Sequence, residues 1–118
     1  MNVVLFNYLV QNGQDISGLY GSSINKHEDY PSYYWALDKD HSIEFITLCS
    51  EELIPIIGGD VVDVLCDGLE LSYTYWHYDR VNNECFKDYV EHSINKAREY
   101  VYYYNNESVL FSFTILDY

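Results

Sequence analysis

Histidine stands near carboxylates at four places in the sequence, a pairing that could bind a metal ion. The four groups are His27-Glu28-Asp29, Asp38 with Asp40-His41, His77 with Asp79, and Asp88 with Glu91-His92. On a helix, Asp88 and His92 would lie one turn apart and could both reach one ion. A metal site needs three or four converging ligands, and each local pair supplies two in a chain that holds 19 acids. We therefore predict that the protein holds no metal and no other cofactor.

Motifs for covalent catalysis or phosphate binding are absent from the sequence. There is no G-x-S-x-G turn and no serine or cysteine protease signature. The Gly58-Gly59 pair is followed by Asp60, which would repel a phosphate group. We therefore predict a protein that is not an enzyme.

The cysteines and the N-terminal residues bear on the compartment. Cys49, Cys66 and Cys85 are odd in number and widely spaced, which argues against a disulfide framework and against a zinc site. Asn2 to Val10 is apolar, but it lacks the basic start and the cleavage site of a signal peptide. No run reaches the roughly 18–20 apolar residues of a transmembrane helix. We expect a cytoplasmic protein with reduced thiols.

The charge balance is strongly acidic. With 19 acids against 6 bases, the 118 residues carry a formal net charge of -13. This excess argues against direct binding of nucleic acid, which needs Lys and Arg, and against an anionic membrane surface. Self-repulsion at this charge destabilises the compact state. We therefore expect the excess to serve a basic protein partner.

Residues 51–70 hold acids and no Lys, Arg or His. Asp60, Asp63 and Asp67 recur at helical spacing, which on a helix would place charges about 5 Å apart along one face. A solvated acidic face that keeps the protein soluble is the competing interpretation. The acids of this stretch, which we predict to bind the partner, are Glu51, Glu52, Asp60, Asp63, Asp67 and Glu70.

Aromatic residues form the second candidate binding feature. The chain has 14 tyrosines, and some must fill the core. Tyrosine and tryptophan are also enriched at protein interfaces. We add Tyr75, Trp76, Tyr78 and the neighbouring Asp79 to the predicted partner-binding residues.

The length and the pattern of the chain predict a single globular domain, residues 1–118. Strands are predicted at Val3–Val10, Ile43–Cys49, Leu69–Tyr78 and Glu107–Leu116, the last of these inside the sheet with Val109, Phe111, Phe113 and Ile115 facing the core. The clearest helix covers Asn83–Tyr104, where apolar residues recur every three to four positions.

Two further segments are ambiguous. A helix could begin at Ser50, and another, capped by Asp60, could cover Val61–Cys66, where a strand competes. The segment Asn25–His41, interrupted by Pro31, stays open between a short helix and a strand. The predicted fold class is α+β, with a mixed or mostly antiparallel sheet of about four or five strands and one long helix of the C-terminal half packed on it.

In size, charge and aromatic content the chain resembles bacterial immunity proteins, which neutralise a cognate toxic nuclease made by the same cell. The resemblance implies a small acidic inhibitor whose exposed acids, such as Asp60, Asp63 and Asp67, meet a basic nuclease. Steering by charge and anchoring by aromatic side chains would suit such a complex.

Three alternatives remain open. The first is a phage-type nucleic-acid mimic, an anti-restriction or anti-CRISPR protein, which shares the same charge logic. The second is a small metal-using enzyme or ligand-binding domain built on the His–carboxylate pairs. The third is an interaction module without a toxin, including a homo-oligomer joined through tyrosine surfaces.

Overall fold

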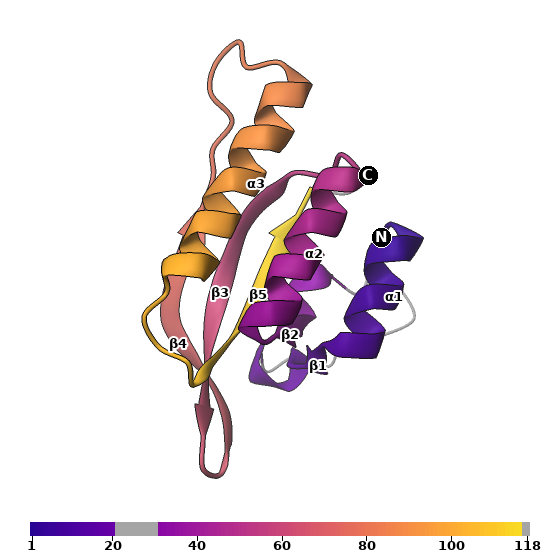
Figure 1. Ribbon diagram of the computed structural model, residues 1–118. Coiled ribbons are helices and arrows are strands. Elements are labelled where there is room, and N and C mark those ends of the chain that lie inside the picture. The colour runs from indigo at the N-terminus through magenta and orange to yellow at the C-terminus, as the bar shows by residue number, and fades with distance from the viewer. Residues whose placement is uncertain (21–30, 117–118) are drawn as a thin grey trace.

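A computed structural model describes residues 1–20 and 31–116, and these form three α-helices and a five-stranded sheet (Figure 1). The strands lie in the order β1-β2-β5-β3-β4, and all neighbours pair antiparallel. The elements are α1 (Val3–Asn12), β1 (Gln14–Asp15), the 3-10 turns η1 (Ser17–Tyr20) and η2 (Ser32–Tyr34), β2 (Trp35–Leu37), α2 (Lys39–Glu51), β3 (Ile56–Leu65), β4 (Gly68–His77), α3 (Phe86–Tyr103) and β5 (Val109–Ile115). The fold is therefore α+β, as predicted, with an antiparallel sheet.

All three helices cover the same face of the sheet (Figure 1). Their buried side chains meet those of the central strands in one core, which includes Leu5 and Leu9 of α1, Phe45 and Ile46 of α2, Ile94, Ala97 and Val101 of α3, Val61 of β3, and Phe111 and Phe113 of β5. The opposite face is covered in part by Ile16, just before η1, which packs on Val62 and Ala36, and by Leu19 and Tyr20 of η1. The single covering helix that the sequence predicted corresponds to α3, and α1 and α2 cover the same face as well.

Three of the predicted elements are confirmed. The strand at 69–78, the helix at 83–104 and the last strand correspond to β4, α3 and β5. β5 lies inside the sheet between β2 and β3, and its residues Val109, Phe111 and Phe113 are buried against the helices.

The predicted strand at Val3–Val10 is wrong, because this segment forms α1. The Asn2 side chain caps the helix by accepting from the backbone N–H of Val4, at 2.9 Å, and of Leu5. Leu5 and Leu9, one turn apart, are the two side chains that the helix buries. The β-branched residues that suggested a strand lie on its exposed side, where packing does not oppose the helix.

The predicted strand at Ile43–Cys49 is also wrong, and it lies inside α2. Asp38 caps this helix by accepting from the His41 N–H at 2.8 Å, and the buried side chains Ser42, Phe45, Ile46 and Cys49 follow helical spacing. Glu51 and Glu52 therefore stand where a helix ends, not where one begins. There the negative end of the helix dipole disfavours their charges instead of stabilising them.

The Asp60 segment forms strand β3, so the alternative of a helix over Val61–Cys66 is wrong. Strand pairing on both sides explains this outcome, since β3 lies between β5 and β4. Gly59 lies in tight contact with Trp76 of β4 and with the backbone of β5. A Cβ at this position would stand 2.1 Å from Cη2 of Trp76 and 2.5 Å from the Ser112 carbonyl oxygen. The absence of a side chain at Gly59 thus lets the Trp76 ring lie across β3.

The structure describes residues 31–41 of the segment Asn25–His41, for which the sequence allowed either a short helix or a strand. Residues 25–30 lie outside the described residues. Beyond them Pro31 precedes η2, and the chain then extends as β2. Ser32 caps no helix with its side chain. Its hydroxyl donates to the Phe113 carbonyl at 2.6 Å. Among residues 1–20 and 31–116, no helix has the length and apolarity needed to span a membrane.

Candidate functional site

The hairpin formed by β3 and β4 extends beyond the helices at one end of the molecule (Figure 1). Asp63 and Glu70 are directly opposite each other across its two strands, and Asp67 lies in the turn between them. We call these three residues the acidic hairpin. Two like charges placed opposite each other in a sheet destabilise it, by roughly 0.2–1 kcal/mol for a cross-strand pair. The fold thus holds together carboxylates that would be more stable apart.

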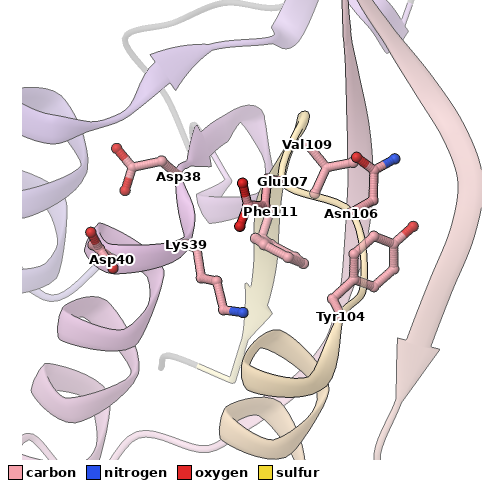
Figure 2. A pocket seen from close by; sticks show the side chains of 8 residues that line it. All are labelled: Asp38, Lys39, Asp40, Tyr104, Asn106, Glu107, Val109 and Phe111. Carbon is pink, nitrogen blue, oxygen red and sulfur yellow. The ribbon is translucent and has the colours of Figure 1, made fainter.

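A hollow of about 290 Å³ lies next to the acidic hairpin, between the start of α2 and the connection from α3 to β5 (Figure 2). Its wall includes Val109, whose strand position is directly opposite Asp63. We call it the acidic hollow, because three of its lining residues are acids. The lining residues are Asp38, Lys39, Asp40, Tyr104, Asn106, Glu107, Val109 and Phe111.

The single base in this hollow, Lys39, is already engaged. Its ammonium donates to the Tyr102 carbonyl at 2.8 Å and lies 5.6 Å from the centre of the Tyr102 ring. Within the described residues, the acid–base contacts short enough to be ion pairs all involve histidine. The carboxylates of the acidic hairpin, Asp40 and Glu107 therefore have no Lys or Arg partner within that part of the chain. This end of the molecule can bind cationic groups.

Asp60 and Tyr75 come together on the sheet face that the helices leave uncovered. They are cross-strand partners on β3 and β4, and Ser112 of β5 is the partner of Asp60 on its other side. The Tyr20 hydroxyl donates to Asp60 at 3.5 Å. Burial raises the pKa of Asp60, and burial together with the Asp60 charge raises the pKa of Tyr20 to about 12. We call Asp60, Ser112, Tyr20 and Tyr75 the Asp60 site.

The other predicted partner-binding residues lie elsewhere. Trp76 is 6% exposed and stacks on Tyr100 in the core, with 4.4 Å between ring centroids. Tyr78 donates to Glu84 at 2.8 Å in the connection between β4 and α3, with Asp79 following it. Glu51 and Glu52 lie at the end of α2. The structure therefore divides the predicted set into several regions and joins Asp63, Asp67 and Glu70 in one of them.

The His–carboxylate pairs occur in the structure as separate contacts. His41 Nδ1 lies 2.8 Å from Asp38, and His77 Nε2 lies 3.3 Å from Asp79. His92 bonds to Glu84 instead of Asp88. The group at residues 27–29 lies outside the described residues. In the part of the chain that is described, no three His, Cys, Asp or Glu side chains are arranged to hold one metal ion.

Sequence reasoning missed Asp38, Asp40 and Glu107 as parts of one surface, and Tyr20 and Ser112 as neighbours of Asp60. Asp38 and Glu107 are far apart in the chain and meet only because α2 and β5 pack together. Strand register alone places Ser112 beside Asp60. No local pattern marks either relation.

Comparison with known proteins gives the class. Residues 22–115 match the family model described as Immunity protein 40. The match spans β2 to β5 with α2 and α3, well over half of the chain. The chain belongs to the Immunity protein 40 family, and its class is that of immunity proteins, which inhibit a toxin. Neither the curated proteins nor the solved structures contain a significant match to it.

Proposed function

We propose that this immunity protein is an inhibitor without enzymatic activity that neutralises a basic toxin, in the first instance a nuclease. It does so by docking the acidic hairpin and the acidic hollow onto the toxin's cationic surface. Membership of the family supports a toxin as the partner. The observation that carries the chemistry is the opposed pair Asp63 and Glu70, held without a neighbouring base among the described residues.

A nuclease fits this surface because its substrate site must carry Lys and Arg to hold phosphates. Carboxylates on opposite strands lie about 5 Å apart at their Cβ atoms, so two cationic side chains of such a site could be engaged at once. Blocking that site would exclude the nucleic acid. The net charge of -13 would also accelerate the encounter at low salt. The phage-type nucleic-acid mimic shares this chemistry, and family membership favours the toxin.

The first experiment captures the partner from the source organism. The tagged protein is incubated with lysate at low salt, and bound proteins are eluted with rising salt and identified. We expect a basic toxin in the eluate, and the purified protein should abolish its nuclease activity. Capture of a toxin that is acidic, or that binds equally well at high salt, would contradict a charge-driven interface, because exposed charge pairs are screened over about 10 Å at 0.1 M salt.

The second experiment locates the surface. Asp63→Asn, Asp67→Asn and Glu70→Gln together remove three charges from the acidic hairpin. Three exposed pairs at roughly 0.2–1 kcal/mol each predict a loss of about tenfold in toxin affinity at low salt. The matched control removes three charges from the exposed side of α3, through Asp88→Asn, Glu91→Gln and Glu99→Gln. We expect the control to bind almost normally, and an equal loss in both variants would show that only net charge matters.

A further inference from the structure

The Asp60 site holds a carboxylate in an environment that does not neutralise it. Asp60 is half-buried in the middle of β3, and no Lys or Arg among the described residues pairs with it. Its one side-chain hydrogen bond, from the Tyr20 hydroxyl, is long at 3.5 Å. A half-buried carboxylate with such weak compensation destabilises a fold unless something pairs with it.

A second polar group in the same cross-strand row is also unsatisfied. The Ser112 hydroxyl is fully buried, and within the described residues it makes no hydrogen bond of 3.5 Å or less, although it lies close enough to the Tyr20 hydroxyl to offset part of the rise that burial causes in the pKa of that group. Ser112 stands beside Asp60 in the register between β5 and β3. Buried hydroxyls almost always find a partner. Ser112 therefore gives Asp60 no compensating hydrogen bond, and its full burial leaves Asp60 as the group that an outside donor can reach.

The surroundings of the Asp60 site fit a flat cation. Tyr75, 68% exposed, flanks Asp60 on the β4 side, and Tyr20 packs against Tyr33 with 5.5 Å between ring centroids. Gly58, two residues before Asp60, carries no side chain that could cover the carboxylate. Aromatic faces attract a guanidinium, which also has five N–H donors in one plane. An ammonium has neither the plane nor the fork.

We propose that the Asp60 site binds an arginine side chain of the toxin, with the guanidinium donating to Asp60 and lying against Tyr75. This deepens the proposed function and rests on it for the identity of the partner. Side chains alternate along β3, where Val61 faces the helices and Val62 faces away from them, so Asp60 lies on the opposite face of the sheet from Asp63. The Asp60 site is therefore a contact region separate from the acidic hairpin.

The chemistry can be tested without the toxin. The ¹⁵N-labelled protein is titrated with argininamide, lysinamide and glycinamide while amide signals are followed by NMR. We expect argininamide alone to shift the signals of Tyr75 and Ser112 in a saturable way. Asp60→Asn should weaken this binding about tenfold or more, because bonds to charged groups contribute about 1.5–3 kcal/mol. Asp88→Asn, which removes the same charge from the exposed side of α3, should leave it unchanged.

A second variant distinguishes a loss of binding from a change of fold. Tyr75→Ala removes a ring that is 68% exposed, so it should keep the melting temperature and still weaken argininamide binding. Equal shifts with lysinamide or glycinamide, or binding unaffected by both variants, would overturn the arginine site.

The captured toxin then tests the source of the arginine. If the site binds argininamide but Asp60→Asn binds the toxin normally, the toxin is not the ligand and that assignment is overturned. If instead no basic toxin is captured while argininamide still binds as described, the proposed function fails and the site stands.

Discussion

The replacement Gly59→Ala tests whether Trp76 belongs to the core or to a binding surface. The added Cβ would lie 2.1 Å from Cη2 and 2.5 Å from Cζ3 of Trp76, and 2.5 Å from the Ser112 carbonyl oxygen. The ring cannot move aside easily, because it stacks on Tyr100 at 4.4 Å and meets the edge of Phe113 at 5.7 Å. The backbone carbonyl is held in the paired strand β5. Three contacts below 3.0 Å must therefore be relieved by distorting the sheet.

Overpacking of a core costs about 1–3 kcal/mol and sometimes more, and a clash with both a wedged ring and a backbone atom belongs at the upper end. We expect a loss of about 3 kcal/mol in the free energy of unfolding. For a chain of this size that corresponds to a melting temperature lower by about 10 °C. Urea denaturation followed by circular dichroism measures the first quantity, and thermal denaturation measures the second.

The matched control is Gly18→Ala, because a Cβ at Gly18 would meet nothing within 4 Å. Its stability should change by less than about 1 kcal/mol and could rise, since alanine restricts the unfolded chain. Adding Trp76→Leu to Gly59→Ala should recover part of the loss relative to the sum of the single variants, because the ring contacts disappear. If Gly59→Ala behaves like Gly18→Ala, the Trp76 ring does not lie over β3 and could act as a surface anchor after all.

Two further predictions concern pH and thiol chemistry. The bond to Glu84 raises the pKa of His92. Burial alone would raise that of Glu84, but hydrogen bonds, first from His92, outweigh it and lower its pKa. The pair therefore stabilises the fold fully between pH 4.5 and pH 6.5, the pKa values of Glu84 and His92 in the unfolded chain. This stabilisation is lost as the pH rises through the folded-state pKa of His92, or as it falls through the folded-state pKa of Glu84. The stability difference between the protein and His92→Gln, measured by urea denaturation, should be larger at pH 5.5 than at pH 9, and a constant difference would refute the pairing. Cys66 and Cys85 are exposed and Cys49 is buried. A maleimide should therefore label two thiols rapidly and the third only when the protein unfolds, and mass spectrometry counts the labels. Rapid labelling of all three thiols would contradict the burial of Cys49.

The parts of the fold that could be predicted are those with a long, unambiguous period. In α3, apolar residues recur over five turns, and in β5 they alternate along the whole strand, so each pattern permits one structure. The segments that became α1 and α2 are short apolar runs, and such runs fit a buried strand as well as a helix. Capping by Asn2 and Asp38 and burial against the sheet decided between the two.

For the candidate site, the sequence by itself determined the chemistry: a large excess of carboxylate, concentrated without a base in residues 51–70, and abundant tyrosine. Tertiary structure decided which of those groups act together. The pairing of β3 with β4 places Asp63 opposite Glu70. Asp60, Asp63 and Asp67 therefore do not form the row along a helix that their spacing suggested. The register between β3 and β5 places Ser112 beside Asp60, and Trp76 is buried in the core instead of lying on the surface. Charge is a sum over residues and can be read from the chain, whereas a binding surface depends on contacts between distant residues, which only the folded sheet creates.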